Sequence, residues 1–207
     1  MKQYLDLVQE VLNRGTRKEN RTGVDTISAF NINYSIDLNE GFPLLTTKEI
    51  SWKNIVVENL WFLSGDLHIG LLKKHGCKFW DHWADEEGYV PSAYGNFWRK
   101  FPIHGEQKYN DQVRYVLDTL KKNPNSRRMV ITAWAPGNAQ TSALPPCHLM
   151  FIFNVQYDKN NEPRLCVHLT QRSCDVALGV PYNIAGYSFL LHLFAHLSGM
   201  KVGTFGH

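Results

Sequence analysis

The chain has 207 residues with a formal net charge of +3, and 43% of its residues are hydrophobic and 20% charged. These values are typical of one soluble globular domain, and the charge is too small to indicate a nucleic-acid partner by itself. No apolar run is long enough to predict a membrane span. The N-terminus carries Lys2, Asp6 and Glu10 and therefore does not resemble a signal peptide. The four cysteines form no C-x-x-C pair, so we expect free thiols, a reducing cytoplasmic setting and no metal site.

The first third of the chain predicts a helix, a strand and a second helix. Residues 1–14 place apolar side chains on one face and are followed by Gly15, as in an amphipathic helix. Residues 30–39 alternate apolar and polar side chains, which predicts a half-buried strand. Residues 51–64 predict a helix with an apolar stripe of Trp52, Ile55, Val56, Leu60 and Leu63.

Glu58 lies on the second predicted helix among mainly apolar residues. One interpretation is a charge at the rim of the helix that points to water. The other is a partly desolvated carboxyl group, whose pKa would be raised and which would suit proton relay.

An aromatic segment follows at residues 79–99. Trp80 and Trp83 are three positions apart and face the same side if this stretch forms a helical turn. They are either packing residues or a surface on which a flat heterocycle can stack. Residues 94–99 predict an irregular segment, which is either site lining or surface.

The second half of the chain alternates helices and strands. A helix is predicted at 109–122, with Tyr109, Val113, Val116, Leu117 and Leu120 facing inward. A long helix at 183–197 is apolar nearly all round, which indicates a central, buried position. Strands are predicted at 129–134, at 149–157 (buried on both faces for most of its length), at 165–169 (its hairpin partner) and at 201–207.

Cys147 follows Pro145 and Pro146 at the start of a predicted strand. Proline fixes its own φ and restricts the residue before it, so the thiol stands on a stiffened arm. The cysteine is either a buried structural residue or a nucleophile that gains from fixed orientation.

Two further groups of polar residues lie at strand ends. Arg127 and Arg128 precede a strand and either clamp an oxyanion or form a solvated edge. Arg172, Ser173 and Asp175 follow the hairpin, where they form either a site or a turn with incidental charges.

Nine blocks of the sequence, taken together and in order, match one family: Asn20–Gly23, Phe42–Lys48, Glu58–Gly65, Trp80–Asp85, Tyr94–Gly95, Ser126–Arg128, Leu144–His148, Gln171–Asp175 and Pro181–Ala185. They resemble the folate-dependent thymidylate synthases. The resemblance covers residues 1–207 and implies an α/β (α+β) single domain with a large mixed sheet flanked by helices, which dimerises sheet to sheet. Compared with that family, we expect the C-terminal segment, which holds the deoxyribose and closes over folate, to be absent from residues 1–207.

The resemblance implies a methyltransferase that converts dUMP to dTMP, with 5,10-methylenetetrahydrofolate as the one-carbon and hydride donor. Cys147 would add to C6 of uracil and make C5 carbanion-like. Two alternatives remain open: a related pyrimidine nucleotide 5-hydroxymethylase, and a non-catalytic nucleotide-binding fragment. Asn183 favours uracil, because a side-chain amide can pair with N3–H and O4 together.

The remaining roles also follow from the resemblance. Arg172 would stabilise the thiolate, and Arg127 and Arg128 would reach the phosphate across a homodimer interface. The implied catalytic residues are Cys147, Glu58, Tyr94, Arg172 and Asp175. The implied dUMP-binding residues are Arg21, Arg127, Arg128, Gln171, Arg172, Ser173 and Asn183, and the implied folate-binding residues are Trp80, Trp83, Asp175 and Lys48.

Overall fold

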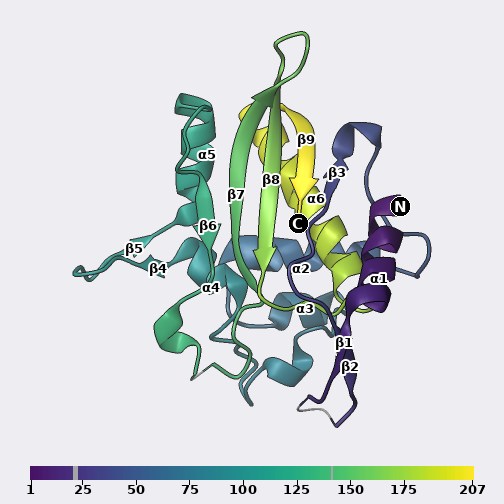
Figure 1. Cartoon of the computed structure of the whole chain (residues 1–207). Coiled ribbons are helices and arrows are strands. Elements are labelled where there is room, and N and C mark those ends of the chain that lie inside the picture. Colours follow the sequence, from purple (N-terminus) through teal and green to yellow (C-terminus); the bar gives the residue numbers. More distant parts are fainter. Residues whose placement is uncertain (21–22, 141) are drawn as a thin grey trace.

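A five-stranded mixed sheet forms the centre of the computed structural model, which describes residues 1–20, 23–140 and 142–207 (Figure 1). Strands β8 and β9 pair in parallel, and the other neighbours are antiparallel. The mixed sheet expected from the sequence is therefore confirmed. In spatial order the strands are β3 (Ser35–Asp37), β9 (Lys201–Gly206), β8 (Pro163–Gln171), β7 (His148–Tyr157) and β6 (Val130–Thr132).

Six α-helices occur in the described part of the chain, and none of them has the length and apolar character that a bilayer span requires. They are α1 (Lys2–Arg14), α2 (Trp52–Ser64), α3 (Gly70–Lys74), α4 (Tyr94–Arg99), α5 (Gln112–Lys122) and α6 (Val180–Ser198). The smaller elements are β1 (Thr16–Lys18), β2 (Thr26–Ser28), β4 (Phe101–Pro102), β5 (Tyr109–Asn110), η1 (Leu38–Glu40), η2 (Asp81–Trp83) and η3 (Pro136–Asn138).

The long helix α6 packs against the inner face of the sheet, as its apolar composition predicts. Phe194 of α6 stacks on Phe153 of β7 with ring centroids 4.7 Å apart. The helix begins earlier than predicted because Pro181, in the first turn, needs no N–H partner there. It ends at Gly199, whose φ of 72° is the left-handed conformation that glycine adopts readily.

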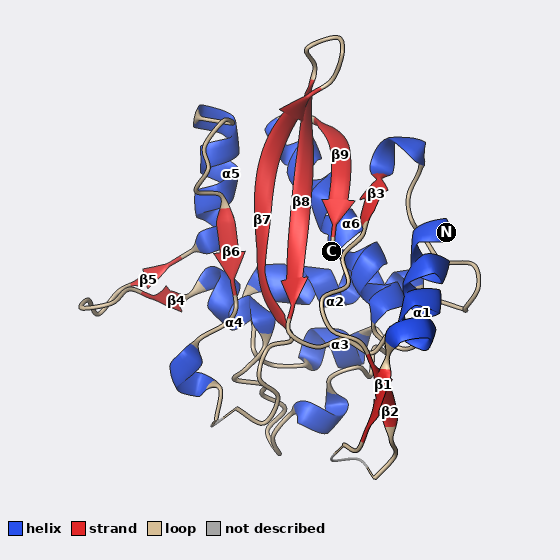
Figure 2. Ribbon diagram, in the orientation of Figure 1, coloured by secondary structure: helices blue, strands red, loops and turns tan. Residues whose placement is uncertain are grey.

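The outer face of the sheet carries no helix in the described residues, as Figure 2 shows. Along β7, Phe151, Phe153 and Val155 are buried, whereas Ile152 is half-buried and Asn154 is exposed. The prediction that residues 149–157 are buried on both faces is therefore wrong for the single chain. Packing against the inner core therefore accounts for only some of the apolar residues of β7.

Three other sequence predictions need correction. The strand predicted at 30–39 is shortened to β3, and Phe30 is 89% exposed although the alternating pattern placed it inward. On α2 the buried side chains are Ile55, Val57, Asn59, Trp61 and Phe62, so Trp52 and Leu60 of the predicted stripe face solvent. Tyr109 is 67% exposed because it lies in β5, before α5 begins.

Residues 79–99 also differ from expectation. Only η2 forms in the first part of this stretch, and the segment predicted to be irregular folds as α4. Four of the six residues of α4 are buried, so burial stabilises a helix that its many aromatic residues and its glycine disfavour on their own.

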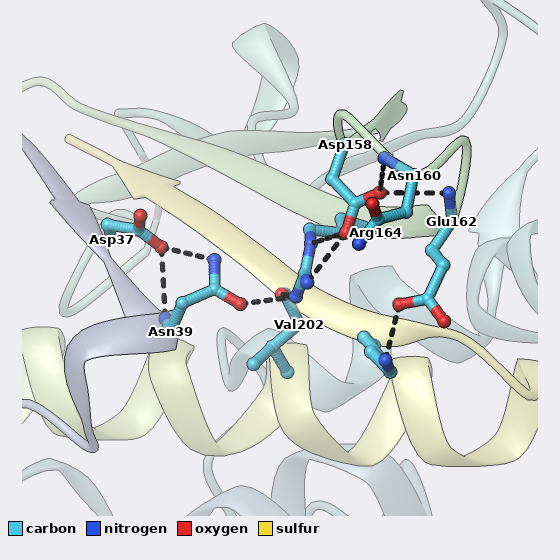
Figure 3. Close-up of polar contacts among 8 residues, drawn as sticks. Asp37, Asn39, Asp158, Asn160, Glu162, Arg164 and Val202 are labelled. Atoms are coloured by element: carbon cyan, nitrogen blue, oxygen red, sulfur yellow. Dashed lines mark hydrogen bonds and ion pairs between the residues drawn. The ribbon is translucent and has the colours of Figure 1, made fainter.

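Arg164 fastens the far end of the β7–β8 hairpin to the rest of the sheet, as Figure 3 shows. Its guanidinium donates to the Asp158 carboxylate at 3.1 and 2.8 Å and to the side-chain oxygen of Asn39. Asp37 in turn accepts from the Asn39 backbone N–H at 2.9 Å. Because Asn39 lies in η1, this chain of contacts holds η1 against the hairpin.

Candidate active site

The thiol of Cys147 lies beside the guanidinium of Arg172 at the end of the β7–β8 hairpin. The last ladder bond is donated by Arg172 N to Cys147 O at 3.0 Å. The same arginine donates from Nη2 to Cys147 Sγ at 3.6 Å and to Pro145 O at 2.7 Å, and from Nε to Pro146 O at 2.9 Å. Cys147 is half-buried rather than sealed in the core. The Arg172 guanidinium therefore holds the Pro145–Pro146 segment (the proline arm) and contacts the Cys147 sulfur at the same time.

Tyr94 supports the backbone at Cys147 and His148. Its hydroxyl oxygen accepts the N–H of Cys147 at 3.0 Å and the N–H of His148 at 3.3 Å. The Tyr94 ring is buried and stacks on the His148 imidazole, with centroids 4.6 Å apart and planes 13° from parallel. Burial raises the pKa of Tyr94, so its hydroxyl stays protonated at neutral pH.

His148 is a neutral imidazole within this group. Burial, followed by the charge of His207, lowers the pKa of His148 to about 3. Its Nδ1 lies 3.1 Å from the Tyr187 hydroxyl of α6. The imidazole thus links the start of β7 to the central helix without carrying charge.

Glu58 is the second ionisable group of the site. Its carboxylate accepts the indole N–H of Trp80 at 2.7 Å. Burial raises the pKa of Glu58 to about 7, and the Trp80 hydrogen bond opposes that shift. The half-buried position and the raised pKa agree with the second of the two sequence interpretations, a partly desolvated carboxyl group, and its role in proton relay stays a prediction. Its charge also raises the pKa of Tyr94 slightly, which places both groups in one cluster.

Trp80 and Trp83 have different environments. Trp80 is only 7% exposed and contacts Trp61, Phe62 and Tyr94 edge-on or tilted. Trp83 is half-buried and lies in η2. Trp83 therefore offers the larger free surface for stacking, while Trp80 mainly packs and orients Glu58.

The segment from Arg172 to Gly179 leads from β8 into α6. One carboxylate oxygen of Asp175, Oδ1, accepts the N–H groups of Ala177 at 2.9 Å and Leu178 at 2.7 Å. Lys48 Nζ donates to Ala177 O at 2.9 Å and so joins the same segment from a distant part of the chain. Within the described part of the chain, the second oxygen of Asp175 accepts no hydrogen bond.

Asn183 and Gln171 each present an amide without a partner. Asn183 lies in the first turn of α6, four positions before Tyr187, so both face the same side as His148. Its side chain forms no hydrogen bond with the described residues. Gln171 is paired with His148 across the strands, and its Oε1 is buried with no partner in the described structure.

The remaining predicted residues lie elsewhere or were not described. Arg127 and Arg128 are exposed and precede β6, and Met129 O accepts from Phe153 N. They therefore lie about six strand residues, roughly 20 Å, from Cys147 in the same chain. Ser173 is exposed beside Arg172. Arg21 lies outside the described residues, so its predicted role has no structural counterpart here.

Sequence reasoning did not assign a role to two residues of the site. Tyr187 was predicted only as core, although its position four residues after Asn183 places it on the same helix face. Trp134 lies with its ring centroid 5.8 Å from the Arg172 guanidinium carbon, a cation–π distance that no sequence pattern indicates. The described residues contain no group of three or more metal-binding side chains.

A thiol in contact with an arginine, with a carboxyl group of raised pKa in the same cluster, resembles the surroundings that activate cysteine nucleophiles in enzymes. The thymidylate synthase family model matches residues 2–207, and the chain belongs to this family. It is similar to a protein of Haloferax volcanii named thymidylate synthase, with 50% identity over 222 aligned residues. The alignment covers 98% of this chain but 63% of that relative, so the chain spans less than two thirds of its length.

Proposed function

We propose that this chain provides the catalytic domain of an enzyme that methylates dUMP at C5 to give dTMP. Support comes from the family assignment and from the named relative. The observation that carries the proposal is the contact of Arg172 Nη2 with Cys147 Sγ at 3.6 Å, on an arm that Tyr94 also fixes.

Cys147 is the nucleophile of the proposed reaction. Its thiolate adds to C6 of uracil, which places electron density on C5. A cation next to a thiolate stabilises its charge, and Arg172 is the side chain that contacts this sulfur. The proline arm and the two N–H bonds to Tyr94 restrict the thiol to one direction of attack.

Glu58 donates or accepts a proton in the proposed reaction. With a pKa of about 7 it is partly protonated at neutral pH and can give or take a proton without a large energetic penalty. Neutral Tyr94 and neutral His148 line the path between Glu58 and the nucleophile. The uncharged neighbours keep the carboxyl group desolvated, which maintains its raised pKa.

Asn183 and the residues around Arg172 recognise the nucleotide. The unpartnered amide of Asn183 can accept from N3–H of uracil and donate to O4, a pattern that cytosine reverses. Gln171 orients the base beside it. Arg172, Ser173 and Arg21 bind the phosphate.

We further propose a homodimer formed through the uncovered face of the sheet. Ile152 and its outward neighbours on β7 lie on that face, and a partner sheet would bury the apolar side chains that the inner core does not explain. Arg127 and Arg128 are too far from Cys147 of the same chain to bind its substrate. Arg127 and Arg128 of the partner subunit therefore complete the phosphate site.

The residues at the mouth of the site fit a folate cosubstrate. 5,10-Methylenetetrahydrofolate supplies the one-carbon unit and the hydride when it is bound. The free oxygen of Asp175 can accept a hydrogen bond from its pterin ring, and Trp83 offers an aromatic surface beside Trp80. Lys48 holds the segment that carries Asp175.

The four free thiols favour a reducing, cytoplasmic setting.

The decisive experiment mixes the protein with dUMP and the folate cosubstrate and follows dihydrofolate by absorbance. We expect dihydrofolate to form and Cys147→Ser to abolish it. A hydroxymethylase would consume dUMP without making dihydrofolate, and a binding module would not be trapped covalently by 5-fluoro-dUMP.

Asn183→Asp should shift the preference from dUMP toward dCMP. An unchanged ratio of the two substrates would contradict the assigned role of Asn183.

A further inference from the structure

Two of the four thiols lie at the same end of the sheet. Arg172 N donates to Cys147 O at 3.0 Å, so these residues face each other at the last rung of the β7–β8 ladder. Facing residues of antiparallel strands have Cα atoms about 5 Å apart. Cys174 is two residues further along, after the chain bends at Arg172. A disulfide requires Cα atoms within about 7 Å, and the bend at Arg172 keeps Cys174 at the end of the sheet where Cys147 lies.

The segment that carries Cys174 has little to hold it in place. Residues 172–175 are all exposed. Within the described part of the chain, neither Ser173 nor Cys174 forms a hydrogen bond, and the next fixed point is the turn that Asp175 caps. The sulfur is partly buried although the residue as a whole is exposed, and this burial, followed by the charge of Cys147, raises the pKa of the Cys174 thiol.

The other two cysteines cannot serve as partners. Cys77 is 1% exposed and belongs to the core. Cys166 is paired with Asn154 in the middle of the hairpin, and its sulfur accepts the Thr204 N–H at 3.3 Å. Seven strand residues separate Asn154 from Cys147, which corresponds to more than about 20 Å. Cys174 is the one thiol placed to react with Cys147.

We propose that Cys174 is the resolving partner of Cys147 in a reversible oxidation of the site. The oxidant is a peroxide. The Cys147 thiolate attacks one peroxide oxygen, the O–O bond breaks, and hydrogen peroxide leaves one water and a sulfenic acid on Cys147. The Cys174 sulfur then attacks the Cys147 sulfur and displaces the second water. Two thiols are oxidised to one disulfide, and one peroxide is reduced to two waters.

In the disulfide, the Cys147 sulfur is bonded to Cys174 and cannot add to uracil. Oxidation therefore inactivates the site, and reduction by a dithiol restores its activity. This consequence rests on the proposed function, whereas formation of the disulfide does not. Sulfenic acid without a resolving thiol proceeds to sulfinic acid, which dithiols do not reduce. Cys174 therefore protects Cys147 from irreversible loss.

The test treats the protein with hydrogen peroxide, blocks the remaining thiols with an alkylating agent and maps the peptides by mass spectrometry without reduction. We expect one intramolecular cross-link between Cys147 and Cys174, two hydrogens lighter than the separate peptides, that disappears after dithiothreitol. Cys166→Ser is the matched control and should form the same cross-link. Cys174→Ser should instead accumulate sulfinic acid on Cys147.

Two results would overturn the proposal. One is an equal yield of sulfinic acid on Cys147 in the unaltered protein and in Cys174→Ser. The other is a cross-link that joins Cys147 to a different cysteine or to a second chain. Neither result depends on turnover, so an inactive protein that still forms the cross-link would contradict only the proposed function. With turnover present, dithiothreitol should restore the activity of the oxidised protein fully and that of Cys174→Ser not at all.

Discussion

The raised pKa of Glu58 makes the stability of the protein depend on pH in a defined interval. In the unfolded chain the carboxyl group titrates at 4.5, and in the folded protein it titrates at about 7. Folding therefore favours the protonated form, and its contribution to stability is complete below 4.5 and is lost as the pH rises through 7. A shift of this size corresponds to about 3 kcal/mol, since each pKa unit is worth about 1.4 kcal/mol.

Glu58→Gln is the perturbation that isolates this effect. The glutamine amide oxygen can still accept the Trp80 N–H, but it carries no charge at any pH. The free energy of unfolding, measured in urea at a series of pH values, should fall for the unaltered protein relative to Glu58→Gln by about 3 kcal/mol between 4.5 and 7. Glu49→Gln, which alters an exposed carboxyl group, is the control. A difference that stays constant over this interval would refute the reasoning.

Three further predictions concern the contacts around the site and the hairpin. Trp80→Phe removes the N–H that stabilises the charged carboxylate and should raise the pKa of Glu58 further, measured by the same pH series. Tyr94→Phe leaves two N–H groups without their acceptor and should lower the free energy of unfolding in urea by about 1–3 kcal/mol, whereas Tyr115→Phe should change it little. Arg164→Met should lower that free energy more than Arg114→Met, because the Arg164–Asp158 pair is 23% and 17% exposed and the Arg114–Asp118 pair 73% and 44%. Equal losses in either comparison would contradict the assigned contacts.

Local sequence patterns were sufficient to predict the long helices and strands. Helix α6 and the β7–β8 hairpin followed from continuous apolar character and from a turn between two apolar runs. The same patterns failed where burial is decided by distant segments. On α2 the pattern could not distinguish Trp52, which is 44% exposed, from Trp61, which is fully buried, because both are large and apolar. The positions of α3, α4 and α6, which pack against α2, decide which of its faces is inner.

In the candidate site, too, local features could be predicted from the sequence and contacts between distant segments could not. The proline arm of Cys147 and the apolar surroundings of Glu58 are local properties, and both could be identified from neighbouring residues. The contacts that connect them are not local: Tyr94 and Cys147 are 53 positions apart, and Lys48 and Ala177 are 129 apart. No periodicity carries that information, which enters only when the sheet sets the register of its strands.

Arg172 illustrates why a residue at the end of a strand can combine two tasks. Its backbone closes the ladder with Cys147, so the hairpin register fixes where its side chain begins. The guanidinium then donates to two consecutive proline carbonyls and to the sulfur from Nε and Nη2, whose positions are fixed relative to each other in its rigid plane. The prolines lack N–H groups and can only accept, so the arginine meets no competing donor on this arm. The positive charge beside the sulfur and the contacts that fix the segment carrying it are therefore supplied by one side chain.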